Sequence, residues 1–301
     1  MGRSQWGIVR AAIRQVTRSF PRLKRAQYGD FLITCLYFWA VLHDRPMTWA
    51  TDRSHYNRTF RPRGRIPSVS QLNRRVASDR FQRILQRVHE RLAGDNRCKG
   101  LVLDGHALPV NAVSQDRDAR VGHIAGGVAN GGMGKGYRLH AVVTGDGNIP
   151  AFSVMPLNTH ELPVARRMLA ALRLDLGGVL IFADGNYDAH VLHKDVARRG
   201  AFLITHPRGR AKHPVTRRQM GRSRRLLIDL WDNCPKLMHR VYQHREQIER
   251  RFGGNLSCTP GLPGGLPKFV RGLPRVRRFV GAKICLYHSH RMAKSLAEKT
   301  V

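Results

Sequence analysis

Two aspartates each end an apolar run that has the length of a buried strand. Asp104 ends the run GLVLD, and Asp184 ends the run GVLIFAD. Because α/β sheets place ligands at the carboxyl ends of their strands, two parallel neighbouring runs would bring these carboxylates side by side. Two carboxylates that close in a dry site require a cation, and hard oxygen ligands suit Mg²⁺ or Mn²⁺. Each aspartate alone reads as ordinary turn chemistry before glycine, so it is the pair that favours a metal site.

A third group of chemical interest lies late in the chain, in the stretch VYQHREQIERRF. Tyr242, Arg245 and Glu249 are three and then four residues apart, which places them on one stripe of a helix. The alternative interpretation is a basic surface helix stabilised by Glu–Arg pairs along its own length.

The charge of the chain indicates its partner. Its 301 residues include 53 Lys and Arg against 20 Asp and Glu, a formal net charge of +33. Such a surface attracts polyanions, so nucleic acid is the expected partner, with an anionic membrane surface as the alternative. A second alternative is that the positive charge belongs to a solvated, arginine-rich surface that binds no partner. The 5 cysteines form no Cys-x-x-Cys pair and favour a reducing compartment.

Residues 1–94 are expected to form a helical DNA-binding domain. Apolar residues recur at helical spacing from Ile8 to Phe20, and the apolar run Phe31 to His43 is too short to span a membrane. A helix start at Pro67 to Ser70 places polar side chains on the first turns that follow, as in a DNA-reading helix; these include Asn73, Arg74 and Arg75. An exposed polar helix face explains the same residues equally well.

Residues 95–301 are expected to form a second, α/β domain in which strands alternate with helices. The turn TGDGN between two strand-like runs predicts a hairpin. The expected elements are strands at 100–104, 137–143, 149–155, 178–184 and 201–206, and helices at 160–174, 189–199 and 234–252.

The glycine-rich stretch GGVANGGMGKGY is not a phosphate-binding P-loop. That motif needs Gly at position 129 and Ser or Thr at position 136, where this chain has Ala129 and Gly136. We expect a basic loop there, with Lys135 near the DNA backbone.

The motif Tyr-x-x-Arg-x-x-x-Glu, following two strand-end aspartates, resembles the signature of bacterial insertion-sequence transposases of the DDE class, in the type-4/type-5 grouping. The stretches GKGYRLHAVVTGDGNIPAFSVMPLNTHE, ADGNYDAHVLHKDVARRGAFLI and LPKFVRGLPRVRRFVGAKICLYH also resemble segments of that family. The likeness covers about Gly100 to His290. The interval from Asp184 to Glu249 leaves no room for a large strand insertion, so the chain is closer to the insertion-free type 5.

This resemblance implies a ribonuclease-H-like mixed sheet flanked by helices, preceded by a small helical domain. It implies that Asp104, Asp184 and Glu249 hold two Mg²⁺ (or Mn²⁺) ions, which cut transposon ends and join them to target DNA. Tyr242 and Arg245 would contact phosphate near the cut. The implied partners are double-stranded DNA and a second copy of the chain in the synaptic complex, in a bacterial cytoplasm at the nucleoid, with no membrane.

Two features depart from the family pattern. Leu256 stands where relatives often carry a lysine, and the segment 253–267 is rich in Gly and Pro where relatives tend to stay helical. Arg250 and Arg251 are the expected substitutes for those DNA contacts. Two other classes remain open: a nuclease of the same fold without strand transfer, and a decayed transposase that only binds DNA.

Overall fold

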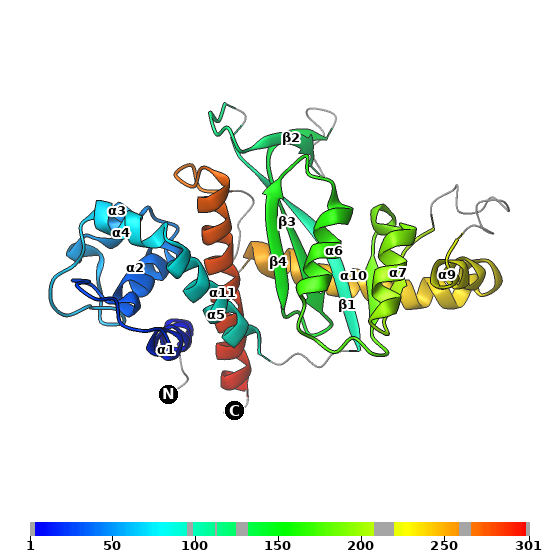
Figure 1. The fold of residues 1–301 in the computed structure, drawn as a ribbon, viewed down its shortest axis with the longest axis horizontal. Helices are drawn as coiled ribbons and strands as arrows, with labels where there is room; N and C mark the ends of the chain where they lie inside the picture. Colours follow the sequence, from blue (N-terminus) through cyan, green and yellow to red (C-terminus); the bar gives the residue numbers. More distant parts are fainter. Residues whose placement is uncertain are drawn as a thin grey trace. The chain divides into compact units, whose positions relative to one another are not determined.

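The computed structural model describes residues 4–94, 99–111, 113–124, 132–207, 220–258 and 266–298, and for 247–258 it describes the backbone alone. The chain divides into two compact units (Figure 1). The helical unit comprises Met1–Gly94, Val113–Asp118 and Leu256–Val301, and the sheet unit comprises Asp95–Ala112 and Ala119–Asn255.

The N-terminal part of the helical unit confirms the expected helices. They are α1 (Gln5–Arg18), α2 (Asp30–Leu42), α3 (Met47–Ala50), α4 (Val69–Val76) and α5 (Asp79–Ala93), with a 3-10 turn η1 (Arg53–His55). The start of α4 lies where the sequence predicted it, because Ser68 and Gln71 form a capping box. The apolar helix α2 is buried around most of its circumference, which explains why its sequence lacks a polar face.

The C-terminal helix α11 (Leu273–Glu298) belongs to the helical unit. Lys283 forms an ion pair with Asp44 (Nζ–Oδ1 2.7 Å), and Gln5 donates a hydrogen bond to the Leu286 carbonyl (3.0 Å). The residues from Val276 to Ser289 are buried except Arg277. The sheet unit thus begins at Asp95 and ends at Asn255, and the last segment of the chain packs on helices far away in the sequence.

The sheet unit is built on one six-stranded sheet. Its strands are β1 (Gly100–Pro109), β2 (Arg120–His123), β3 (Met133–Thr144), β4 (Ala151–Pro156), β5 (Leu180–Ala183) and β6 (Phe202–Ile204). The order is β2-β3-β1-β5-β6, and β4 also pairs with β3. β3 runs antiparallel to β1 and β4, whereas β5 is parallel to β1 and β6. This curled mixed sheet with flanking helices is the ribonuclease-H-like fold (Figure 1).

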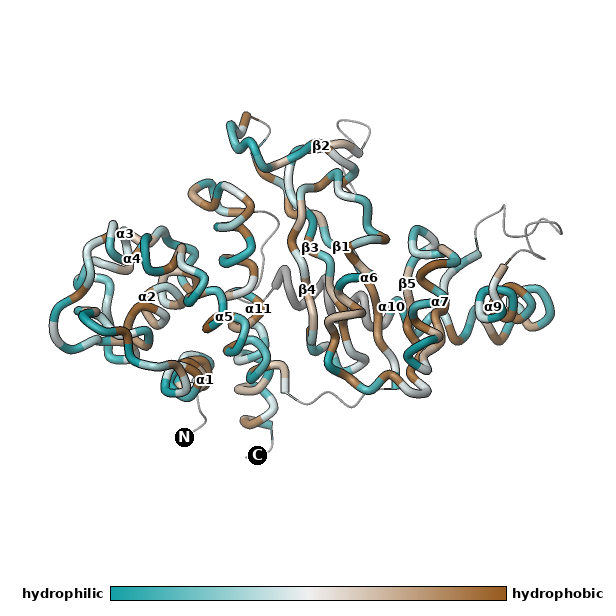
Figure 2. The backbone as a smooth tube through the Cα atoms, viewed as in Figure 1, coloured by the Kyte–Doolittle hydropathy of each residue, from teal (hydrophilic) through white to brown (hydrophobic). Residues whose placement is uncertain are grey.

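Helices of the sheet unit fix which strand residues reach the core. They are α6 (Glu161–Ala171), α7 (His190–Arg198), α9 (Arg222–Asn233) and α10 (Pro235–Cys258). Leu101 and Leu103 of β1 and Ile181 and Ala183 of β5 share one buried cluster with side chains of α6 and α7. Figure 2 shows hydrophobic residues along β1. Because side chains alternate across a strand, the residues that follow Leu103 and Ala183 point to the opposite face.

Four features of the sheet unit differ from the sequence prediction. β1 continues past Asp104 because it stays paired with the long strand β3 as far as Pro109. β2 and α9 were not predicted. Lys135 lies within β3, paired with β2, and not in a loop; residues 125–131 of the expected loop lie outside the described residues. An added Cβ on Gly136 would lie 2.4 Å from the Leu108 carbonyl oxygen, so glycine there permits close strand packing.

Candidate active site

The two candidate acids lie at equivalent positions of adjacent strands. β1 and β5 are parallel and in register, with Leu103 opposite Ala183. Asp104 and Asp184 follow these partners directly, and they point away from the α6–α7 cluster by strand alternation. The expected pairing of the two runs as parallel neighbours is therefore present.

The surroundings of Asp104 oppose its charge. Burial raises the pKa of the Asp104 carboxyl group and the charge of Asp184 raises it further, while the Gly105 N–H, Arg245 and His106 lower it. The Gly105 N–H donates to Oδ1 of Asp104 (2.8 Å). A cation bound between Asp104 and Asp184 would offset the repulsion between the two carboxylates and stabilise both in their ionised forms.

Asp184 is oriented by the turn that it begins. It caps the 3-10 turn η3 (Gly185–Tyr187). Its Oδ1 accepts a hydrogen bond from the Asn186 N–H (2.7 Å) and its Oδ2 accepts one from Asn186 Nδ2 (3.2 Å). Both contacts leave lone pairs on the carboxylate, which has two oxygens and about four acceptor positions.

Tyr242 links α10 by a hydrogen bond to β5, the strand that precedes Asp184. Its hydroxyl donates to the Ala183 carbonyl (3.0 Å) and accepts from Arg245 Nη1 (2.9 Å). The Arg245 guanidinium also lies 5.5 Å from the centre of the Tyr242 ring, and its charge lowers the pKa of Asp104. Glu249 follows one turn later on the same helix. Its backbone is helical, but its side chain lies outside the described residues.

A fourth acid lies close to the pair, and the sequence reasoning did not single it out. Glu161 opens α6 and forms an ion pair with Arg138 of β3. Burial raises the pKa of Glu161, Arg138 lowers it, and Asp184 and Asp104 both raise it. A Cβ added to Gly105 would lie 3.6 Å from Oε1 of Glu161, an ordinary contact distance, so Glu161 lies beside the residue that follows Asp104. The Asn-x-x-Glu turn before α6 was the available signal.

Asp188, four residues after Asp184, is an acid with a structural role. It precedes α7, and its side chain is only 1% exposed. Arg224 of α9 grips both of its oxygens (Nε–Oδ1 2.8 Å, Nη2–Oδ2 2.7 Å), and His193 Nε2 lies 3.2 Å from Oδ1. A buried carboxylate with these partners joins α7 to α9.

The expected DNA contacts are distributed between the two units. In the helical unit, Arg74 is exposed, whereas Arg75 is bound to Asp30 (2.7 Å) and to the Tyr28 carbonyl (2.9 Å). The structure thus gives Arg75 an internal partner. Lys135 is half-buried in the sheet unit. The side chains of Arg250 and Arg251 lie outside the described residues, and α10 continues as far as Cys258, through the start of the segment 253–267.

The donor set of Asp104 and Asp184 fits a divalent cation, since hard oxygen ligands are those that Mg²⁺ prefers. No three His, Cys, Asp or Glu side chains form a metal-binding group within the described part of the chain, and Glu249, the expected third ligand, is not in that part. No helix among the described residues is long and apolar enough to cross a membrane.

A ribonuclease-H-like sheet with aspartates on adjacent parallel strands defines a class of metal-dependent nucleic-acid enzymes. Residues 99–254 match the family model described as the transposase DDE domain. This match covers more than half of the chain, which therefore belongs to the DDE transposase family. That family acts on DNA and generally uses divalent metal ions. No curated protein and no solved structure gave a match.

Proposed function

We propose that the protein is the transposase of an insertion sequence, of the type-5-like group, that cuts the ends of its element and joins them to target DNA. The observation that carries this proposal is the parallel register of β1 and β5, which makes Asp104 and Asp184 neighbours. With Glu249 on α10, these acids would hold two Mg²⁺ or Mn²⁺ ions. Such ions activate the attacking oxygen and stabilise the leaving oxygen of a phosphodiester.

The chain's own residues would prepare this site. Asn186 orients Asp184 through both of its nitrogens. Tyr242 holds α10, and hence Glu249, at the end of β5. Arg245 places a positive charge near Asp104, where it would also meet the phosphate that approaches the acids. Water attacks in strand cleavage and the freed 3′-hydroxyl attacks in strand transfer, so no covalent protein–DNA bond forms.

The helical unit would recognise the ends of the element. Arg74 on α4 is the proposed base contact, because it is exposed and pairs with no other described residue. Lys135, Arg250 and Arg251 are proposed phosphate contacts, supported by the net charge of +33. We further propose a homodimer in the synaptic complex and a cytoplasmic, nucleoid-associated location.

The test uses DNA that carries the inverted repeats flanking the gene, with labelled ends and Mg²⁺. We expect strand cleavage at the repeat and joining of its 3′ end to a second DNA. Asp104→Asn and Asp184→Asn should bind this DNA as the wild type does but cut it at least a hundredfold more slowly. Cleavage without joining would favour the nuclease alternative, and binding without cleavage would favour a decayed transposase.

A further inference from the structure

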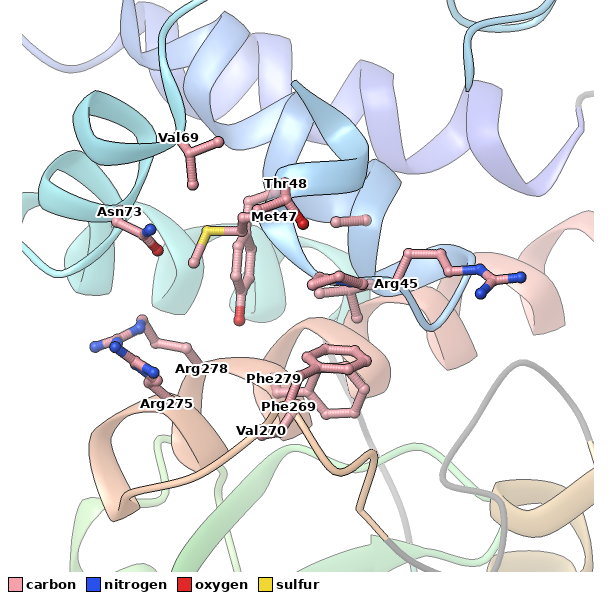
Figure 3. Close-up of a pocket in the computed structure, with 14 residues that line it drawn as sticks. Arg45, Met47, Thr48, Val69, Asn73, Phe269, Val270, Arg275, Arg278 and Phe279 are labelled. Atoms are coloured by element: carbon pink, nitrogen blue, oxygen red, sulfur yellow. The ribbon is translucent and has the colours of Figure 1, made fainter. Parts of the chain in front are cut away.

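A pocket of about 180 Å³ lies within the helical unit (Figure 3). Residues of α2, α3, α4, α11 and the segment before α11 line it. For comparison, an engineered cavity of about 150 Å³ holds benzene, so this pocket accommodates a group of that size. Apolar walls come from Met47, Val69, Phe269, Val270 and Phe279, among others.

The polar lining of this pocket is basic. Arg45, Arg275 and Arg278 line it together with Tyr37 and Asn73, and none of the described lining residues is acidic. Figure 3 shows Arg275 and Arg278 together on one side, with Asn73 facing them and Arg45 extending away. The charge of the pocket lining therefore favours an anionic ligand.

Arg278 is the least expected member of this lining. It is only 7% exposed, and it has no hydrogen bond or ion pair to any of the described residues. Burial lowers the pKa of its guanidinium, Tyr37 raises it, and the like charge of Arg275 lowers it further. The nitrogens of Arg278 are not among the fully buried side-chain atoms that lack a partner, so the guanidinium opens onto the pocket, where it stays charged and its partial loss of water contact costs free energy. An anion in the pocket would remove this cost.

We propose that this pocket binds a backbone phosphate of DNA, with Arg275 and Arg278 gripping the same phosphate and the attached sugar lying on the apolar wall. The planar fork of arginine matches phosphate oxygens and binds them in pairs. The amide of Asn73 supplies a further donor.

A strand of DNA fits the surroundings better than a small free anion does. Exposed basic residues adjoin the lining in sequence: Arg74 follows Asn73 on α4, Arg277 precedes Arg278, and Lys268 and Arg271 flank Phe269 and Val270. A strand that continues beyond the pocket would use these charges. The first N–H groups of α11 do not contribute, because Asp118 and Asp116 accept from Leu273 N (2.8 Å) and Gly272 N (2.9 Å).

The experiment measures the affinity of the full chain for duplex DNA as a function of salt, by fluorescence anisotropy. Each phosphate neutralised contributes about −0.9 to the slope of log K against log salt. Arg275→Ala and Arg278→Met should each reduce the slope by about 0.9 and weaken all sequences alike. The double variant should also lose only about 0.9, because the pocket holds one phosphate and needs both arginines to hold it. Arg83→Ala on α5, exposed and equal in charge change, is the control and should leave the slope unchanged.

Arg275 is exposed, so its replacement keeps the test valid if Arg278→Met fails to fold. A wild-type slope in Arg275→Ala, or an equal loss in Arg83→Ala, would overturn the proposal. A third outcome would also overturn it. Inorganic phosphate would raise the Tm of the wild type but not of Arg275→Ala, while the two proteins showed equal salt slopes. The pocket would then bind a free anion and not DNA. The ligand class rests on the proposed function, but catalysis does not enter the assay: inactive Asp184→Asn should show the wild-type slope.

Discussion

Replacing Tyr242 by Phe tests whether α10 is held at the acid pair by one hydroxyl group. This hydroxyl donates to the Ala183 carbonyl and accepts from Arg245. A neutral hydrogen bond contributes about 0.5–1.5 kcal/mol and one to a charged group about 1.5–3 kcal/mol. We therefore expect the free energy of unfolding of the sheet unit to fall by about 2–4.5 kcal/mol.

The larger effect is expected on cleavage. A displacement of about 1 Å in a reacting group costs roughly a hundredfold in rate, and Tyr242 positions the helix that carries Glu249. Tyr242→Phe should lower the rate of Mg²⁺-dependent cleavage at saturating DNA by about that factor. The assay is single-turnover cleavage of end-labelled DNA, beside denaturant unfolding of the same preparations.

Tyr56→Phe is the matched control. The Tyr56 hydroxyl also donates to a backbone carbonyl, that of Ala50 (2.6 Å), but in the helical unit. This variant should lose about 0.5–1.5 kcal/mol of stability and keep its cleavage rate at saturating DNA. If Tyr242→Phe cut DNA at the wild-type rate, the hydroxyl would not position the helix that carries Glu249.

Asp188→Asn should destabilise the sheet unit by about 3–5 kcal/mol in urea unfolding, because it breaks a buried pair with Arg224; a loss below about 1 kcal/mol would contradict the structural role. Arg245→Met removes a charge that lowers the pKa of Asp104, so the acid limb of the pH–rate profile should move to higher pH. A limb that stays in place, or moves to lower pH, would show that Arg245 does not act on this acid.

The raised pKa of Asp104 also predicts how the stability of the metal-free protein changes with pH. In the metal-free protein, a carboxyl group with a raised pKa favours folding below its unfolded pKa, and this contribution is lost as pH rises through the folded pKa. Mg²⁺ binds the ionised form, so the rise in Tm caused by Mg²⁺ should grow with pH over the same range. A constant rise in Tm across that range would speak against Asp104 as a ligand.

The sequence predicted the features that depend on neighbouring residues or on strand geometry. Asp104 and Asp184 could be expected side by side because apolar runs of strand length in an α/β pattern become parallel neighbours. The start of α4 could be read from Pro67, Ser68 and Gln71, since a capping box is local.

The features that escaped prediction depend on distant partners. The burial of Asp188 could not be predicted, because nothing near it in the sequence shows that Arg224 binds it. Glu161 gained its place near the acids from the position of α6 on the sheet and from Arg138. The packing of α11 with the first helices joins residues such as Gln5 and Leu286, which no local pattern connects.

Cleavage of the polypeptide by a bound metal tests directly whether Asp104, Asp184 and Glu249 hold the same metal ions, as we propose. Fe²⁺ in place of Mg²⁺, with ascorbate and peroxide, produces radicals that cut the polypeptide next to a bound metal. Mass spectrometry of the fragments from the protein–DNA complex should show cuts near all three acids, and excess Mg²⁺ or Asp184→Asn should suppress them together. Cuts near Asp104 and Asp184 without cuts near Glu249, or cuts that persist in Asp184→Asn, would show that the three acids do not hold the same metal ions.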